Sequence, residues 1–138
     1  MAANTAPIFP LTPVIGIATL VAPTAITSRA NITGTTGLVQ LTATSTNGTK
    51  VSLITVKAKA TSVATNLFIW LYNGTTSYLF DEIDIPVTTA SNTGDSYFVT
   101  KNYETAYGAS IVLPPTYQFF ISVSVQQDLN VFAYGGTY

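Results

Sequence analysis

The acidic side chains that could support chemistry are grouped on one short stretch of the chain. Asp81, Glu82 and Asp84 supply three of the six carboxylates in the 138-residue sequence. On an extended strand Glu82 and Asp84 point to the same face, about 7 Å apart, a spacing that suits a divalent cation or a carboxylate pair. A catalytic pair normally draws its members from different elements, and no second element supplies one. We therefore interpret the trio as charges that keep an edge strand from mispairing, with a metal at Glu82 and Asp84 as the open alternative.

The composition removes most other chemistry. The chain has no cysteine and no histidine, which excludes disulfides, thiolate nucleophiles, the usual metal ligands and the usual general base. Serine and threonine nucleophiles lack an evident base, and no phosphate-binding glycine loop is present. Five scattered basic residues are too few for a nucleic-acid interface. We predict a protein that is not an enzyme, with no catalytic residue, no cofactor, no metal and no nucleic-acid partner.

Aromatic side chains offer a binding surface of another kind. Trp70, Tyr72, Tyr78 and Phe80 lie close together in the sequence, on two strands that an Asn-Gly turn at Asn73 joins. Such a group is able to stack against sugars, as in lectin-like sandwiches. Cross-strand packing in a core or a subunit interface is an equally simple account, and it is the one we favour. A carbohydrate-binding or host-attachment module remains the alternative.

These residues must be positioned by β-strands. Residues 56–86 read as three strands in a row, which indicates an antiparallel β protein. Within them, Leu67–Tyr72 is apolar on both faces. One face fits a sandwich core, and the other needs a second cover from the N-terminal segment, a loop or another subunit.

Alternation of apolar and polar residues extends the pattern to the rest of the chain. Val51–Ala60 and Tyr117–Val125 each have one apolar and one polar face. The spacing of these runs predicts an all-β fold, an antiparallel jelly-roll-like β-sandwich of about eight strands, built from residues 29–138. A turn of helix is expected between Asn102 and Ser110.

Residues 1–28 have a different texture. They hold four of the seven prolines together with small or apolar side chains. Proline cannot donate to a strand ladder and biases its predecessor towards extended geometry, so we predict an extended N-terminal arm rather than a core strand. No basic residue precedes the apolar run, and prolines interrupt it, so it is neither a signal peptide nor a membrane span.

The low charge predicts a protein that works in an assembly. Charged residues make up 8% of the chain and apolar residues 47%, so the surface is hydrated but repels little. We expect the arm, the doubly apolar strand and the aromatic C-terminal end to contact neighbouring subunits. The candidate interface residues are Ile8, Phe9, Leu11, Val14, Ile15, Phe68, Trp70, Tyr72, Tyr134 and Tyr138.

Several motifs, taken in order, resemble a family of small tailed-bacteriophage proteins. They are the "PIF" start at Pro7, the stretch VKAKATSVATNLFIWLYNGTTSYLFDEIDIP, the segment LPPTYQFFISV and the final NVFAYGGTY. Each motif alone is weak, and their succession covers most of the chain. The proteins that it resembles are virion structural proteins of the head decoration, or cement, type.

The resemblance implies a function that the residues alone do not give. It implies a jelly-roll-like β-sandwich, a homotrimer, that sits on the outer surface of the capsid and is made in the host cytoplasm. Its partners would be the major capsid protein and further copies of itself, without a membrane. No functional residue is carried over from the family. A tail or neck structural protein is a further alternative that the sequence does not separate from this one.

Overall fold

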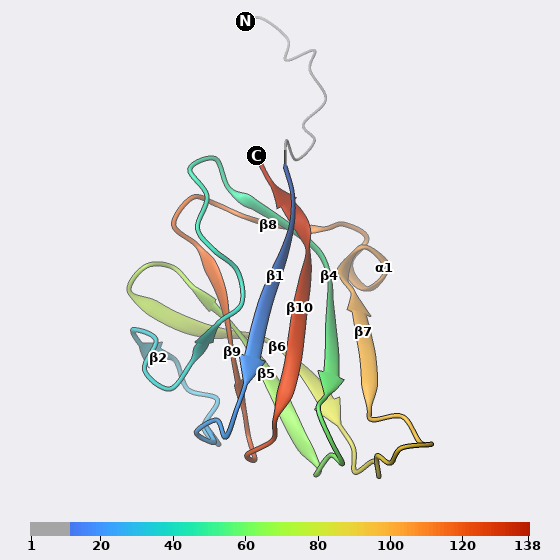
Figure 1. The fold of residues 1–138 in the computed structure, drawn as a ribbon. Coiled ribbons are helices and arrows are strands. Elements are labelled where there is room, and N and C mark those ends of the chain that lie inside the picture. The colour runs from blue at the N-terminus through green and yellow to red at the C-terminus, as the bar shows by residue number, and fades with distance from the viewer. Residues whose placement is uncertain (1–11) are drawn as a thin grey trace, which may run out of the picture.

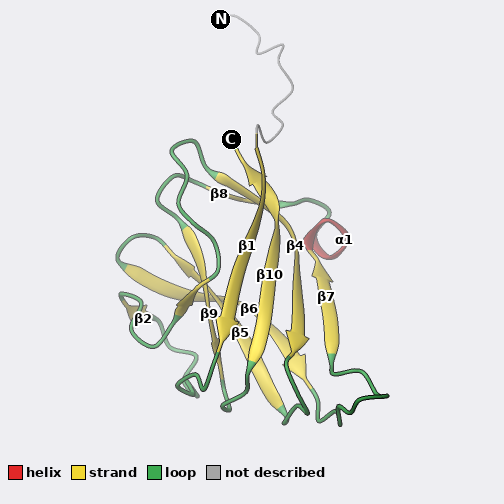
Figure 2. Cartoon of the chain, in the orientation of Figure 1, coloured by secondary structure: helices red, strands yellow, loops and turns green. Residues whose placement is uncertain are grey.

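The computed structural model describes residues 12–138, which form ten strands and one short helix (Figures 1 and 2). In chain order they are β1 (Thr12–Leu20), β2 (Ile32–Thr33), β3 (Val39–Gln40), β4 (Thr49–Ala58), β5 (Thr65–Tyr72), β6 (Thr76–Ile85), β7 (Phe98–Asn102), α1 (Tyr103–Tyr107), β8 (Ile111–Leu113), β9 (Gln118–Val123) and β10 (Leu129–Thr137). The prediction of an all-β chain is confirmed, with strands in place of most of the expected runs.

The strands form two antiparallel sheets of five strands each. Sheet A has the order β1-β10-β4-β7. The fifth strand, β8, lies on the same side of β4 as β7: β8 pairs with the first residues of β4, and β7 pairs with later ones. Sheet B has the order β2-β6-β5-β9-β3. In Figure 1 the strands of sheet A lie side by side across the front of the molecule, and those of sheet B lie behind them.

The main core fills the space between the sheets. Ile54, Val56 and Ala58 point inward from β4, as their alternation predicts, and the same holds for Phe119 and Ile121 on β9. A fully buried Val or Leu side chain contributes about 1.5–3 kcal/mol relative to exposure. The two-residue period therefore locates the core correctly along β4 and on the inward face of β9. The other face of β9, predicted to be polar, is buried as well, at Phe120 and Ser122.

The predicted arm is wrong for residues 12–20, which form β1. Residues Thr12–Leu20 pair with β10 along its whole length, from Thr12 opposite Thr137 to Leu20 opposite Leu129. Ala18 and Leu20 are buried in the main core. Pro13 is tolerated because it lies near the beginning of an edge strand, where a missing N–H costs little. This part of the segment is an integral strand of sheet A.

A β-bulge changes the faces of β6. Ile69 lies opposite Asp81 and Trp70 lies opposite Leu79, so Phe80 is the extra residue. Phe80 packs on the main core beside Phe119, while Leu79 packs on the opposite side of the sheet. The sequence pattern, read without the bulge, assigns these two side chains to the wrong faces.

Two local features match their sequence signals. Asn73 Oδ1 accepts hydrogen bonds from the backbone N–H groups of Thr75 and Thr76 at the β5–β6 turn. The side chain of Asn102 caps α1 by accepting from Thr105 N at 3.2 Å. At five residues α1 is short, and no helix within residues 12–138 is long and apolar enough to cross a membrane.

Candidate interaction surface

The second face of β5 is covered by the protein's own chain. Phe68 and Trp70 point away from the main core and, with Phe120 of β9, form a second buried cluster. Residues 21–38, here the cover segment, lie over this cluster and contribute Ile26, Ile32 and Leu38 to it. Of the three covers that the sequence leaves open, a segment of the same chain is the one found.

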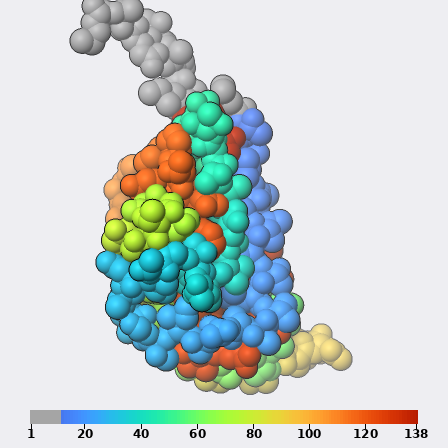
Figure 3. All heavy atoms as spheres, turned by 90° about the vertical axis from the view of Figure 1, so that its left-hand side faces the viewer, coloured from blue at the N-terminus to red at the C-terminus, as the bar shows by residue number. Residues whose placement is uncertain are grey.

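Backbone hydrogen bonds hold the cover segment in place. Ile26 N donates to Val123 O at 2.8 Å, and Gly34 N donates to Thr75 O at 2.7 Å. Ser77 Oγ adds a bond to Gly34 O at 2.7 Å. Figure 3 shows the blue-to-cyan atoms of this part of the chain spread over the lower part of one flank. The segment therefore belongs to the folded domain and closes its second cluster.

This cover corrects the prediction for two interface residues. Phe68 and Trp70 are both 0% exposed, so neither is available to a neighbouring subunit or to a sugar. Trp70 Nε1 donates to Ser122 Oγ at 2.9 Å, which satisfies the indole N–H inside the cluster. Tyr72 is half-buried, and its hydroxyl donates to Gly74 O at 2.8 Å. The doubly apolar strand is thus explained without a partner.

Replacing Trp70 by phenylalanine is expected to lower the free energy of unfolding by about 1–3 kcal/mol. The smaller ring leaves a void, and Ser122 Oγ loses its buried partner. Chemical denaturation of the purified variant measures the loss. Tyr78→Phe is the matched control, because Tyr78 is 40% exposed and its change should leave stability within about 0.5 kcal/mol. Equal stability of Trp70→Phe and wild type would contradict the buried cluster.

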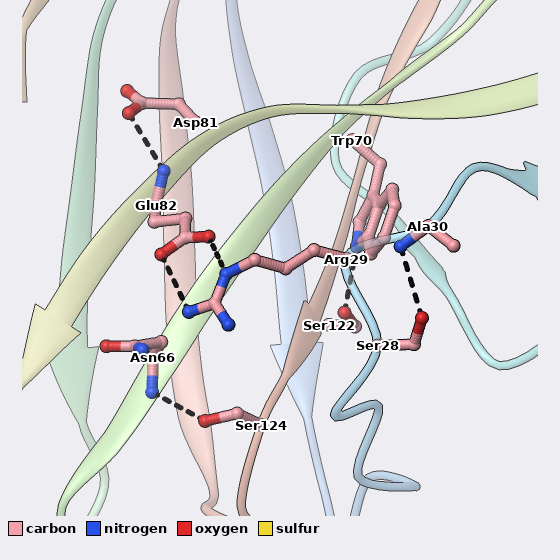
Figure 4. Close-up of polar contacts among 9 residues, drawn as sticks. All are labelled: Ser28, Arg29, Ala30, Asn66, Trp70, Asp81, Glu82, Ser122 and Ser124. Atoms are coloured by element: carbon pink, nitrogen blue, oxygen red, sulfur yellow. Dashed lines mark hydrogen bonds and ion pairs between the residues drawn. The ribbon is translucent and has the colours of Figure 1, made fainter.

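Glu82 forms an ion pair with an arginine. Arg29, in the cover segment, reaches across β5 to Glu82 on β6, with Nη2 3.2 Å from Oε2 and a second, shorter bond from Nε to Oε1 (Figure 4). Its guanidinium carbon lies 5.2 Å from the ring centroid of Phe68, which it helps to cover. Residues 12–138 contain no cluster of three or more carboxylates that could hold a metal ion. Glu82 therefore fastens the cover segment to sheet B.

The Arg29–Glu82 pair predicts that folding stability depends on pH. The hydrogen bond from Arg29 holds the pKa of Glu82 below its ordinary value of 4.5. A lowered folded-state pKa stabilises the fold above the unfolded-state pKa, and this contribution is lost as the pH falls below about 4.5. We expect Glu82→Gln to melt at a lower temperature than wild type at neutral pH and the two curves to converge in acid. A constant difference across the titration would argue against the pair.

Asp81 has a separate structural role between the sheets. Its carboxylate, 10% exposed, accepts from Lys101 Nζ at 2.6 Å and from Tyr103 Oη at 3.0 Å. Burial, reinforced by the Asp81 charge and hydrogen bond, raises the pKa of Tyr103 far above its ordinary value, so the phenol stays neutral. The trio joins β6 of sheet B to β7 and α1. Adjacent Asp81 and Glu82 therefore serve different contacts, on opposite faces of one strand.

The outer face of sheet A is the part of the described surface that is rich in apolar side chains. Its central rows, read across β1, β10, β4 and β7, hold Ile15, Tyr134, Leu53 and Asn102; Ile17, Phe132, Thr55 and Thr100; and Thr19, Asn130, Lys57 and Phe98. We call the six apolar members the open face: Ile15, Ile17, Leu53, Phe98, Phe132 and Tyr134.

Four of the six side chains of the open face are exposed, Leu53 and Phe132 are half-buried, and the face is nearly uncharged. Ile17 is 62% exposed, Phe98 58% and Ile15 53%. Lys57 is the single charged residue in these rows, and its ammonium donates to Ser96 O at 3.1 Å. Five of the six side chains adjoin one another, and Phe98 lies apart from them beyond Lys57 and Thr100. Exposed apolar groups of this kind mark sites of protein–protein contact. The open face is the candidate interaction surface.

The sequence locates this surface only in part. Ile15 and Tyr134, both candidate interface residues, lie opposite each other on the open face. Val14 is 37% exposed at the beginning of β1, and Tyr138 is half-buried near Gly48. Ile8, Phe9 and Leu11 lie outside the described residues. Sequence reasoning missed Ile17, Leu53, Phe98 and Phe132; period two with Ile15 is the signal that could have found Ile17.

Hollows in the described surface offer little to a small substrate. A cavity of about 30 Å³ lies beneath β1 and β10 and has room for a single water. The buried Thr49 hydroxyl, which has no hydrogen-bond partner among residues 12–138, lies at its wall. Two wider, open depressions have no aromatic residue for sugar stacking. One of about 230 Å³ is lined by Ala64, Thr65, Asn66, Asp84 and Ser124, and one of about 440 Å³ by Thr44, Ser45, Thr46, Pro115 and Thr116. The open face is the stronger candidate.

Comparisons of the chain with protein-family models, with curated proteins and with solved structures found no match.

Proposed function

We propose that the protein is a non-enzymatic virion structural protein, a capsid decoration protein that binds the outer surface of a bacteriophage head and stabilises its shell. The observation that carries the binding role is the open face, a nearly uncharged apolar surface on a domain whose cores are closed. The phage head as the binding target rests on the resemblance of the sequence motifs. A jelly-roll-like arrangement of the two antiparallel sheets is part of the same proposal.

The mechanism is burial of apolar area. Each subunit places Ile17, Phe98 and Tyr134 against the shell and removes their surface from water, at about 25 cal/mol per Å². Bound across neighbouring shell proteins, the subunit adds contacts that must break before those proteins separate. The low charge of the chain limits repulsion between many copies held close together.

A binding assay with two open-face variants and one control variant tests the proposal. Phe98→Lys and Tyr134→Lys each place a charge on the open face and are expected to weaken binding to purified shells, from the particle whose genome encodes the chain, by about tenfold or more. Val87→Lys is the matched control, since Val87 is 68% exposed and lies outside the open face. Wild-type binding by both open-face variants, or no binding of wild type, would overturn the proposal.

Deletions test the contribution of the N-terminal residues to binding separately from that of the open face. Removing residues 1–28 deletes β1 and part of the cover segment, so loss of binding would only reflect unfolding. Removing residues 2–11 leaves every described strand in place. If the predicted docking residues Ile8, Phe9 and Leu11 act with the open face, this shorter chain melts like wild type but binds shells more weakly.

Two other functions stand as alternatives. A carbohydrate-binding or host-attachment module would give signals on a glycan array, and a tail or neck protein would appear at those positions in electron micrographs of the particle. The aromatic group proposed for sugar stacking loses Trp70, which is fully buried. Decoration of the head therefore remains the function that we propose.

A further inference from the structure

Strand β1 lies at an edge of sheet A and has one neighbouring strand. All nine residues of Thr12–Leu20 are paired with β10, and no other described strand pairs with β1. One side of β1 therefore carries unpaired backbone N–H and C=O groups, the template on which another strand adds. Figure 3 shows β1 in blue along the margin of the flank, where it reaches the surface over its length.

The other sheet edges are short, interrupted or charged. The outer strands of sheet B, β2 and β3, have two residues each, and the part of β6 that extends beyond β2 carries Asp81, Glu82 and Asp84. On the far side of sheet A, β7 has five residues and leads directly into α1. Short edges are a known protection against strand addition, and so are charged side chains. Strand β1 has neither protection: it is nine residues long and carries no charge.

The sequence of β1 is complementary to itself. Gly16 is the middle residue of Thr12–Leu20. If two copies of β1 lie antiparallel with Gly16 opposite Gly16, all nine residues overlap, and Ile15 of each copy lies opposite Ile17 of the other. Both isoleucines belong to the open face, where directly opposite side chains have Cβ atoms about 4.5–5.5 Å apart. Pro13, which lacks an N–H, falls near the end of the overlap.

We propose that β1 pairs antiparallel with β1 of a second copy of this chain, about a twofold axis at Gly16. Sheet A of each copy then continues into the other, and two Ile15–Ile17 pairs cover side chains that are more than half exposed in the single chain. The same strand on both sides makes the contact isologous, so it closes as a dimer. This pairing does not depend on the proposed function, because it uses the edge of the sheet and needs no shell.

Sedimentation of the purified full-length chain tests the pairing. Contacts of a single strand pair are small, so the series should run from about 1 µM to about 1 mM. A monomer–dimer equilibrium is expected, and the slow hydrogen exchange of β1 amides should extend to more residues as the dimer forms. A monomer over the whole series, or the homotrimer that the sequence resemblance implies, would overturn the proposal.

A pair of charged variants tests the register. Ile15→Glu alone and Ile17→Lys alone should each raise the dissociation constant about tenfold or more. In either homodimer each new charge lies opposite an isoleucine, and the two copies bring two like charges close to each other on either side of the axis at Gly16. Mixed together, they should form a heterodimer, since Glu at position 15 of one chain then lies opposite Lys at position 17 of the other. No recovery on mixing would exclude this register and overturn the axis at Gly16.

A third variant distinguishes dimerisation through the edge of β1 from binding through the open face. Phe98→Lys changes a side chain that is about as exposed as Ile17 and lies on the same face of sheet A, but at the opposite edge of the sheet, on β7. It should leave dimerisation unchanged while weakening the shell binding proposed above. Dimerisation lost in Phe98→Lys would contradict pairing through β1. The melting curve of each variant identifies one that fails to fold, and the wild-type sedimentation result decides the proposal in that case.

Discussion

A chain with alanine in place of Gly135 is expected not to fold. At the bulge between β10 and β4, Tyr134 lies opposite Leu53 and Gly135 lies opposite Val51. A Cβ atom at position 135 would lie 2.7 Å from Lys50 C and 3.1 Å from Val51 Cα, and closer still to Lys50 O. All three are backbone atoms of the central strand β4, which cannot move aside as a side chain can. The loss should exceed about 4 kcal/mol, a large part of the stability of an ordinary domain.

The result is read from circular dichroism and from the yield of soluble protein. Gly94→Ala is the matched control, because the nearest atom to its Cβ would be Ser91 Oγ at 3.1 Å, the end of a side chain that can rotate. The control should melt within a few degrees of wild type. A Gly135→Ala protein with a wild-type melting temperature would mean that β10 and β4 do not approach each other in this register.

Asp81→Ala should lower the free energy of unfolding by about 2–4 kcal/mol. The substitution removes the acceptor of Lys101 and of Tyr103, and Tyr103 is fully buried. Breaking a buried ion pair by removing one partner usually costs about 3–5 kcal/mol. Lys101 keeps 30% of its side chain exposed and regains some hydration, so the lower part of that range is expected. Urea denaturation at neutral pH measures the change.

Asp84 provides the control for Asp81. It lies on the same strand, but it is exposed, and Asp84→Ala should change stability by less than about 0.5 kcal/mol. A double variant, Asp81→Ala with Lys101→Met, should recover part of the loss because it removes the unpaired ammonium as well. Equal effects of Asp81→Ala and Asp84→Ala would contradict a bridge between the sheets.

Strands that the sequence predicts well are those whose side chains alternate without interruption. In β4 the inward residues Ile54, Val56 and Ala58 follow one another at every second position, and the structure buries all three. Such a pattern is local, so it can be read from one stretch of chain. The bulge at Phe80 is different, because it depends on how β6 is matched to β5, and no residue near it signals the shift.

The N-terminal segment shows how a local rule is overridden. Prolines in residues 1–28 predict an extended arm outside the sheets, yet only Pro13 falls within β1 and it lies near one end. The strand forms because β10, more than a hundred residues later, offers an unpaired edge. A pairing of such sequence separation leaves no trace in a short window, which is why the part of the surface carried by Ile17 was not predicted.

The composition predicts that an apolar interaction surface exists better than the residue pattern predicts which residues form it. Low charge and a doubly apolar strand indicated surfaces that need a cover, and Phe68 and Trp70 did need one. The cover came from residues 21–38 of the same chain, while the exposed apolar surface lies on the other sheet. Both facts depend on which sheet packs on which segment, and the alternation of a single strand does not contain that information.

The place of β10 in sheet A has a consequence for biosynthesis. Strand β10 lies between β1 and β4, and it follows every other described strand in the sequence. While the ribosome is still translating residues 129–137, β1 and β4 lack the neighbour that joins them, and their apolar side chains stay open to water. Sheet A therefore closes only after its last strand has left the exit tunnel. Nascent chains should bind general chaperones until then, and a product truncated before Leu129 should be degraded rather than accumulate.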